Sequence, residues 1–418
     1  MAGCGRTGKL WARVARQARR WIVGLLAGCV ASATLSGCAW PSGPTNSPSP
    51  GTRAIAWIRQ DAHDIAQVWA SVDDGPPRQI THRAGPPPAC GYDIFGAPMF
   101  APDLRHIAVA GGATCGDGQL RGQLFVVDAA TGAIATVPLP GSGTLLTTQR
   151  SYGWVDARTL FALGDFDGDS GGVLYTLGAQ TATPLPGLPS IIAEGVVRGA
   201  TLFYVTADQP SGPIGTGKDQ SKDQYTLYHT LLSRYDLSAH EPLPGAVDLG
   251  IFAMCACATG DFHLPGWDAS PDGAHIAYQQ VTPAVPTSAL TGIASQTIFY
   301  ANSDGSAPTQ IVKALVTAAR VRMRFSPDGT MIAITEAFNS PDVASGCVNT
   351  IGLYGDPCMQ FYGPDAYSYP AWHADSAYLI ASAAPPALAP ESSLYRYTPS
   401  RFHGVPFAAN GYNPWSTP

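Results

Sequence analysis

The amino-acid sequence predicts an all-β protein built as a single β-propeller, and three observations carry this prediction. Gly (46) and Pro (37) together make up about a fifth of the 418 residues, which favours many turns and short strands. Charged residues are only 13% of the chain, which argues against a coiled coil or a disordered acidic protein. A turn followed by a short apolar strand also recurs at about the 40–50-residue spacing of propeller blades. The spacing predicts seven four-stranded blades, with six as the alternative.

The repeat is clearest in two places. Residues 325–329 (FSPDG) and 269–273 (ASPDG) each precede a strand of alternating apolar residues. In such a turn Pro fixes φ, Asp accepts hydrogen bonds from the turn backbone, and Gly tolerates positive φ. A second strand pair follows the first, as in residues 298–302, so each unit is predicted to hold four strands. Weaker copies of the repeat are centred on Phe100, Trp154, Val196 and Trp372.

The two ends of the repeat region are predicted to form one blade together. Residues 54–81 contain the later strands of a blade but not its first strand, and residues 411–416 (GYNPWS) fit as that missing strand. Their pairing would close the ring and leave no free sheet edge. Residues 207–225 interrupt the repeat with a polar insertion, which is predicted to be an exposed loop.

Residues 1–37 are predicted to be a signal peptide. A basic segment precedes the apolar run 21–33, which is shorter than the ~20 residues that cross a bilayer. The run leads into residues 35–38 (LSGC), which resemble the lipobox of bacterial lipoproteins. The resemblance implies that Cys38 is diacylated through its sulfur and becomes the new N-terminus, whereas a plain secretory signal is the alternative. We therefore expect an extracytoplasmic protein anchored to the bacterial cell membrane by lipid on Cys38.

Residues 38–53, rich in Pro and Ser, are predicted to be a tether between the lipid and a folded domain at residues 54–418. The formal net charge is −6, and it becomes more negative once the basic residues of the signal peptide are removed. An acidic chain without a basic stripe argues against nucleic-acid binding and leaves membrane attachment to the acyl chains. We expect a monomer.

Six cysteines follow Cys38, an even number that favours disulfides in an exported protein. Six cysteines allow fifteen connectivities. The pairs nearest in sequence are Cys90–Cys115, Cys255–Cys257 and Cys347–Cys358. The first and last pairs each close a short loop, but a Cys-x-Cys ring is strained. Redox chemistry or metal binding is therefore the alternative for the middle pair, although no zinc-like ligand spacing surrounds it.

One acidic segment is a candidate metal site. Asp165, Asp167 and Asp169 alternate along the chain, and carboxylates at this spacing can converge on calcium. Thr176 stands where a calcium loop has its bidentate acid, so an acidic hairpin turn is the alternative. No other cofactor is predicted. Residues 168–172 (GDSGG) match a protease motif in letters only, because no catalytic His context accompanies them.

The histidines and aromatic residues follow the repeat. His106 and His275 begin repeat strands and His373 replaces the turn Ser, so all three are predicted to be turn or surface residues rather than ligands. The tryptophans that recur at blade positions are predicted to pack between blades. They are Trp57, Trp69, Trp154, Trp267, Trp372 and Trp415.

The Ser-Pro-Asp-Gly turn followed by Ile-Ala-Tyr or Ile-Ala-Ile resembles the TolB-type, WD-like propeller repeat. The same repeat occurs in the propeller domains of prolyl-oligopeptidase-type peptidases. The resemblance covers residues 54–418 as architecture and carries no catalytic residue, because the turn is structural. The sequence shows neither the N-terminal helical domain of TolB nor the hydrolase domain of the peptidases.

Two functions compete. The first is a non-catalytic binding or scaffold protein for a cell-envelope protein, peptide or glycan, because a propeller offers a rigid ring with loop-built faces. The alternative is a propeller enzyme, a hydrolase or lyase acting on glycans at the channel mouth. A carboxylate pair about 5–10 Å apart on one face would favour the enzyme. The aspartates that recur in register are predicted to be turn formers, so no catalytic residue is assigned.

Overall fold

The computed structural model describes much of the chain between residues 53 and 416. The described ranges are 53–63, 65–83, 93–94, 96–114, 120–140, 144–145, 150–166, 169–189, 192–207, 213–214, 225–255, 265–283, 293–312, 320–338, 345–352, 360–363, 370–383, 393–397, 405–409 and 411–416. The chain divides into two compact units, residues 1–46 and 47–418, and every described residue belongs to the second. The predicted signal peptide and Cys38 lie outside the described residues. Within the described ranges, no helix has the length and apolar character needed to span a membrane.

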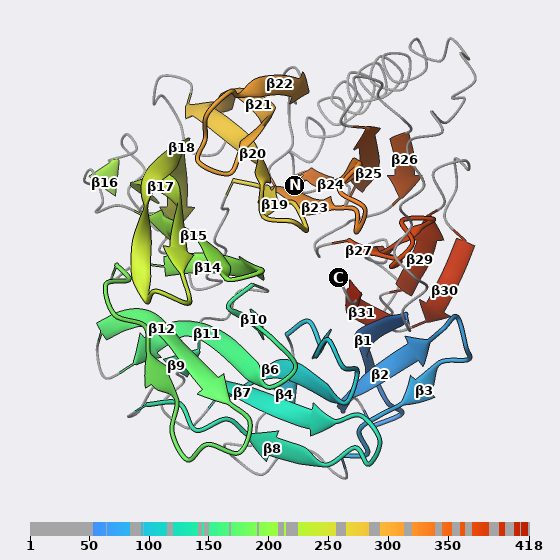
Figure 1. The fold of residues 1–418 in the computed structure, drawn as a ribbon. Helices are drawn as coiled ribbons and strands as arrows, with labels where there is room; N and C mark the ends of the chain where they lie inside the picture. The colour runs from blue at the N-terminus through green and yellow to red at the C-terminus, as the bar shows by residue number, and fades with distance from the viewer. Residues whose placement is uncertain are drawn as a thin grey trace, which may run out of the picture. The chain divides into compact units, whose positions relative to one another are not determined.

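Six β-sheets make up the described part of the chain, and no helix accompanies them there (Figure 1). Sheet I contains β3 (Arg78–Gln79), β2 (Ala66–Val72), β1 (Ala54–Gln60) and β31 (Gly411–Ser416). Sheet II contains β8 (Ile134–Thr136), β7 (Leu120–Asp128) and β6 (His106–Thr114), with β4 (Asp93–Ile94) and β5 (Met99–Phe100) both paired to β6. Sheet III contains β13 (Thr183–Pro184), β12 (Asp169–Thr176) and β11 (Thr159–Phe166), with β10 (Tyr152–Trp154) and β9 (Thr144–Leu145) both paired to β11.

The remaining sheets come from the second half of the chain. Sheet IV contains β14 (Ile192–Arg198), β15 (Thr201–Ala207), β17 (Tyr225–Asp236), β18 (Glu241–Cys255), β20 (His275–Pro283), β21 (Ile293–Asn302) and β22 (Thr309–Val312), with β16 (Pro213–Ile214) on β17 and β19 (Trp267–Ala269) on β20. Sheet V contains β23 (Arg320–Phe325), β24 (Met331–Phe338), β25 (Ser345–Gly352) and β26 (Gln360–Gly363). Sheet VI contains β27 (Ala371–Trp372), β28 (Leu379–Ala383), β29 (Ser393–Tyr397) and β30 (Val405–Ala409).

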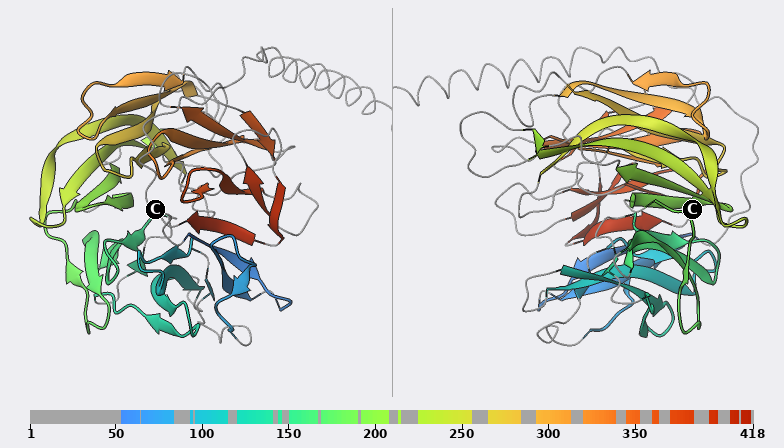
Figure 2. Two further views of the ribbon diagram at one scale, coloured as in Figure 1. Left: turned by 45° about the vertical axis from the view of Figure 1, so that its right-hand side comes forward. Right: turned by 90° about the vertical axis from the view of Figure 1, so that its left-hand side faces the viewer.

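The sheets of residues 47–418 lie around a common centre, which confirms the predicted all-β propeller (Figures 1 and 2). Their innermost strands contact one another in turn: β5 with β10, β10 with β14, β14 with β19, β19 with β23, β27 with β31, and β31 with β5. Sheet IV is held together at its middle by one parallel pair, Gly250 with Val281. Its two antiparallel halves each have the four-strand order of the other sheets. Seven blades remains a prediction, because these halves share one hydrogen-bonded sheet.

The ring closes as the sequence predicts, through pairing of the first and last strands. β31 runs antiparallel to β1, from Ile55 opposite Ser416 to Arg59 opposite Gly411. The closure is reinforced by packing between sheets I and VI, where Trp57 is fully buried and its ring meets Phe407 edge-on at 5.3 Å. β31 thereby completes the four-strand order β3-β2-β1-β31 of sheet I, which joins both ends of the repeat region in one sheet.

The repeated turn has the chemistry that its residues predict. Ser270 Oγ donates to Asp272 at 2.5 Å and accepts the His275 amide at 2.9 Å, while Gly273 has a φ of 69°. The second copy repeats this, with Ser326 Oγ donating to Asp328 at 2.6 Å. These bonds hold the inner strand and its neighbour in a tight hairpin. The motif is therefore a structural device, as expected.

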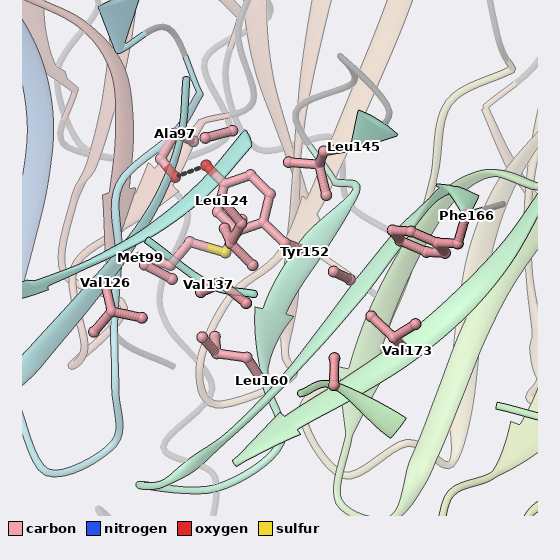
Figure 3. Close-up of a cluster of buried hydrophobic side chains, with 14 residues drawn as sticks. Ala97, Met99, Leu124, Val126, Val137, Leu145, Tyr152, Leu160, Phe166 and Val173 are labelled. Atoms are coloured by element: carbon pink, nitrogen blue, oxygen red, sulfur yellow. Dashed lines mark hydrogen bonds between the residues drawn. The ribbon is translucent and has the colours of Figure 1, made fainter. Parts of the chain in front are cut away.

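The core lies between neighbouring sheets rather than inside any one of them. Figure 3 shows the cluster between sheets II and III, where Met99, Leu124 and Leu160 pack around Tyr152. The Tyr152 hydroxyl donates to the Ala97 carbonyl at 2.5 Å. The only polar group of this buried side chain therefore has a hydrogen-bond partner. Of the tryptophans predicted to pack between blades, Trp57, Trp267 and Trp372 are fully buried.

Connections differ in length between the two ends of the strands. First-to-second and third-to-fourth strand connections leave from one end, which we call the turn face, and they are short, as at 101–105 and 270–274. The other connections leave from the opposite end, which we call the loop face. They include two long ones, 80–98, which contains β4, and 208–224, which contains β16. The predicted polar insertion, 207–225, spans the latter connection together with the last residue of β15 and the first of β17.

Candidate functional site

Most of the predicted chemistry lies outside the described residues. Only the backbone of Cys255, at the end of β18, and of Cys347, in β25, is placed. The remaining predicted lipidation and disulfide cysteines lie outside the described residues: Cys38, Cys90, Cys115, Cys257 and Cys358. Lipidation and the three disulfides therefore stay predictions.

The predicted calcium segment forms the tip of a hairpin. Asp165 pairs with Ser170 and Asp169 pairs with Phe166 across β11 and β12, and Asp167 lies outside the described residues. The structure gives no side-chain placement for the three carboxylates, so calcium binding stays a prediction. Among the described residues, no group of three or more His, Cys, Asp or Glu side chains is arranged to hold a metal.

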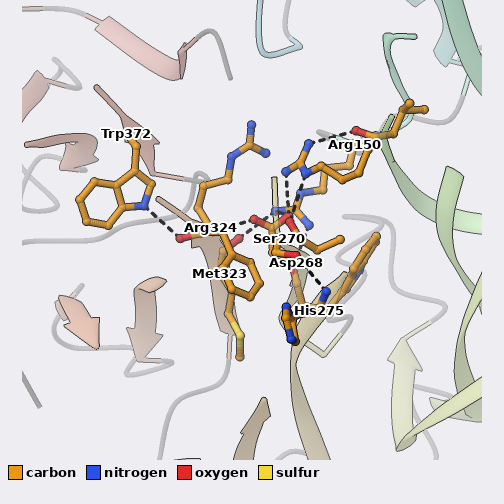
Figure 4. A network of polar contacts seen from close by, with 12 residues as sticks. Arg150, Asp268, Ser270, His275, Met323, Arg324 and Trp372 are labelled. Carbon is orange, nitrogen blue, oxygen red and sulfur yellow. Dashed lines mark hydrogen bonds and ion pairs between the residues drawn. The ribbon is translucent and has the colours of Figure 1, made fainter. Parts of the chain in front are cut away.

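A buried ion-pair network, which we call the central node, links the inner strands. Its members are Arg150, Arg198 and Asp268, and Figure 4 shows Arg150 and Asp268 within it. Asp268 is fully buried in β19 and lies 3.3 Å from Arg150 Nη2 and 3.4 Å from Arg198 Nη2. Its second carboxylate oxygen accepts the Phe325 amide of β23 at 2.8 Å. One carboxylate therefore joins sheets III, IV and V.

Arg150 extends this network across the ring. Its Nη1 donates to the Trp267 carbonyl at 2.7 Å and its Nη2 to the Met323 carbonyl at 2.8 Å, while its side chain is only 1% exposed. Burial lowers the pKa of the Arg198 guanidinium, and the charge of Asp268 opposes that shift. The central node contains three charged groups, but they are buried and directed at one another. Its arrangement suits inter-sheet attachment rather than substrate binding.

A second polar group, which we call the seam cluster, lies on the turn face where sheets I and VI meet. It consists of Arg53, Asp74, His373, Asp375, Tyr378 and Arg396. The His373 ring is 3% exposed and stacks on Tyr378 at 4.3 Å. Its Nδ1 lies 2.5 Å from Asp375 Oδ1, and its Nε2 lies 3.6 Å from Asp74 Oδ2. A carboxylate pair thus flanks one imidazole.

The turns that carry Asp375 and Asp74 explain the local position of each carboxylate. His373 occupies the turn position of Ser270 and Ser326 and makes the same contact to the Asp two residues later. Asp74 comes from the β2–β3 turn, where its φ of 56° is one that Asp tolerates better than most residues. Sequence register therefore predicted the turn position of His373. It could not predict the approach of Asp74, which comes from the opposite end of the propeller chain.

The remaining members of the seam cluster engage the two carboxylates. The Tyr378 hydroxyl donates to Asp74, Arg396 Nη2 lies 3.8 Å from the same carboxylate, and Arg53 Nη1 lies 3.1 Å from Asp375. Burial opposes ionisation of Asp375, but the hydrogen bond from His373, the Ala377 amide and two nearby positive charges hold the pKa of its carboxyl below the usual value. Burial and the contact with Asp74 raise the pKa of the Tyr378 phenol.

The seam cluster has acid–base residue types but no open acid–base pair. Both ring nitrogens of His373 face carboxylates, and the Tyr378 hydroxyl is already donated to Asp74. General catalysis needs a group within hydrogen-bond reach of a substrate proton. The observed contacts instead join the N-terminal and C-terminal sheets of the ring. Sequence reasoning missed both polar groups, although charged residues within inner strands, such as Asp268, are the signal that marks the central node.

Comparison with solved structures agrees with this architecture. No protein-family model matches the chain. No curated protein matches it. An oligogalacturonate lyase in complex with manganese is 13% identical and aligns with a TM-score of 0.50 over 84% of each chain. The oligogalacturonate lyase of Vibrio parahaemolyticus is 12% identical, with a TM-score of 0.50 over 85% of each chain.

A prolyl endopeptidase is 11% identical with a TM-score of 0.50, and the match covers 86% of this chain and 50% of that one. Identities this low carry information on the fold alone. Together with the ring of antiparallel sheets, they show that this chain has a propeller-like all-β fold.

Proposed function

We propose that this chain is a non-catalytic binding or scaffold protein of the cell envelope, held at the membrane by lipid on Cys38. The observation that carries the proposal is that the charged groups of its two polar clusters contact one another. Within the central node, charged groups contact one another and link neighbouring sheets. The same holds, separately, within the seam cluster. Such contacts rigidify a frame, and a rigid frame is what a propeller contributes to recognition.

The position of Arg53, where the proposed tether meets the propeller, supports different roles for the turn face and the loop face. Arg53, the last residue of the proposed tether, is held on the turn face, where its amide donates to Asp73 at 2.8 Å and its guanidinium contacts Asp375. A chain leaving Arg53 toward the membrane therefore departs from the turn face. The long connections leave from the loop face, away from the attachment point. We propose that the partner, a protein, peptide or glycan, meets the loop face.

Photo-crosslinking in intact cells tests this proposal. A photoreactive residue at His63, on the loop face, should capture one envelope component that is identified by mass spectrometry. The matched control is Ala239, exposed on the turn face, which should not capture it. Loss of the product in a Cys38→Ala variant would tie recognition to the anchor. Capture of nothing from His63, or equal capture from both positions, would contradict the proposal.

The alternative is an enzyme acting on glycans, and two observations favour it. Asp74 and Asp375 form a carboxylate pair around His373 on one face, and two similar structures are oligogalacturonate lyases. One of those lyases is bound to manganese, so the enzyme alternative includes a metal requirement. Incubation with oligogalacturonate, with and without Mn²⁺ or Ca²⁺, separates the alternatives. Accumulation of an unsaturated sugar product, lost in His373→Gln but retained in His275→Gln, would establish the lyase.

A further inference from the structure

A hollow of about 450 Å³ lies at the rim of the propeller, between sheets I and II, and neither polar cluster includes it. Its walls are the outer strand β3 with the residues around it, and the turn between β7 and β8. The lining residues are Pro77, Arg78, Gln79, Ile80, His82, Ala129, Ala130 and Thr131. Its volume is within the ~300–1,000 Å³ range of small-ligand sites and suits one or two sugar rings.

The walls of the hollow are fixed by direct contacts between the two sheets. Arg78 Nη2 donates to the Ala129 carbonyl at 2.9 Å. The Ala129 amide in turn donates to the Arg105 carbonyl at 2.9 Å. Gly132 approaches the Ile80 carbonyl so closely that a Cβ there would lie 2.2 Å from its oxygen. The hollow is therefore pre-formed, which lowers the ordering cost of binding.

The ionisable side chains that line the hollow are basic, whereas the chain as a whole is acidic. Its lining contains Arg78 and His82 and no acidic residue, although the chain has a net charge of −6. Asp128 lies at the start of the adjoining turn. Its carboxylate accepts hydrogen bonds from the amides of Ala130 and Thr131 and from the Thr131 hydroxyl. Those bonds hold the pKa of the Asp128 carboxyl below its usual value.

Two donors on the same wall are available to a ligand. Arg78 is exposed and, within the described part of the chain, its side chain makes one hydrogen bond, which leaves most of its guanidinium fork uncommitted. His82 is also exposed, and its ring has no hydrogen-bond partner among the described residues. Gln79 differs, because its amide already donates to the Thr81 carbonyl at 2.8 Å. Arginine is the side chain best matched to a carboxylate or phosphate.

We propose that this hollow binds the oxyanion of an acidic sugar, with Arg78 as the principal contact and His82 as the second. The oxyanion is the carboxylate of a uronate or the phosphate of a sugar phosphate, which present the same chemistry to a guanidinium. The inference goes beyond the proposed function, because it assigns a second site and the chemical class of its ligand. It places this site on the rim, between sheets I and II.

Titration calorimetry of the purified mature chain tests the inference with three probes: D-glucuronate, D-glucose 6-phosphate and D-glucose. The first two differ from glucose by an anionic group at one position. We expect at least one anionic probe to bind, and glucose to bind at least about tenfold more weakly, since a charged hydrogen bond contributes about 1.5–3 kcal/mol. The anionic probe that binds more tightly identifies the source of the oxyanion.

Two variants localise the binding. Arg78→Gln should weaken the anionic probe about tenfold, and Arg78→Lys should restore part of that loss because it keeps the charge. Arg158→Gln is the matched control, since it removes an exposed arginine from a turn of sheet III and should leave binding unchanged. Thermal melting of each variant shows that it is folded.

Equal binding of glucose and the anionic probes, no binding of either anion, or equal losses in Arg78→Gln and Arg158→Gln would each overturn the inference. These outcomes are distinct from failure of the proposed function. Crosslinking at His63 depends on the loop face and is read out separately from the rim hollow.

Discussion

Replacing Asp268 by Asn is the sharpest test of the structural role assigned to the central node. Asn has nearly the shape of Asp but no charge, so the change removes the electrostatic partner of Arg150 and Arg198 while filling the same space. Asp268 is fully buried, and its carboxylate also accepts the Phe325 amide. The substitution therefore removes the one carboxylate that contacts both guanidinium groups inside the ring.

The expected magnitude follows from that burial. Breaking a buried ion pair by removing one partner costs about 3–5 kcal/mol, because the remaining charge stays desolvated and uncompensated. The side chain of Arg150 is 1% exposed and that of Arg198 is 12% exposed, so water cannot replace the lost carboxylate without opening the inner strands. For a domain of this size, a loss of about 4 kcal/mol lowers Tm by about 5 °C.

Urea unfolding followed by tryptophan fluorescence measures the change, with Asp103→Asn as the matched control. Asp103 is exposed in the turn between β5 and β6 of sheet II, at the repeat position of Asp272, and it accepts the Arg105 amide at 3.0 Å. Its substitution should cost less than about 1 kcal/mol. A loss below about 1 kcal/mol for Asp268→Asn, or equal losses for the two variants, would refute the assignment of the central node as an attachment between sheets.

Three further predictions concern the same frame. Gly132→Ala should destabilise the protein in urea by more than about 2 kcal/mol, whereas Gly178→Ala, which has a similar positive φ but nothing within 4 Å, should cost about 1 kcal/mol. Deleting residues 410–418 removes β31 and should lower Tm by more than about 5 °C and speed hydrogen exchange in β1; unchanged exchange would contradict closure by that strand. The pKa of Asp375 is lowered in the folded state, so its stabilising effect is present above the unfolded value near 3.8 and is lost as pH falls below it. Tm measured from pH 5 to pH 2 should therefore fall less steeply in Asp375→Asn than in the parent protein.

The sequence predicted the fold because the repeat is local. A turn of Ser, Pro, Asp and Gly specifies its own hairpin, and the structure shows those bonds at Ser270 and Ser326. The alternation of apolar residues after each turn then sets which side chains face the neighbouring sheets. Even the closure could be predicted, because one blade lacked a strand and the last residues of the chain had the pattern of a strand.

The polar clusters could not be predicted in the same way. His373 replaces Ser in its turn, and the sequence explains its contact with Asp375, two residues away. Its second partner, Asp74, comes from the other end of the propeller, and only ring closure brings them within 3.6 Å. Arg150 and Asp268 likewise belong to different sheets, and nothing near either residue in sequence identifies the other.

The amino-acid sequence by itself determined the class of fold, the chemistry of the turns and the pairing of the two terminal strands, since each depends on residues a few positions apart or on a missing element of a repeat. Only the tertiary structure decided which charges meet at the centre, which join the seam and which line the hollow at Arg78. The physical reason is that these contacts form between sheets. Their geometry depends on how the whole ring packs, and local sequence preferences carry no information about that arrangement.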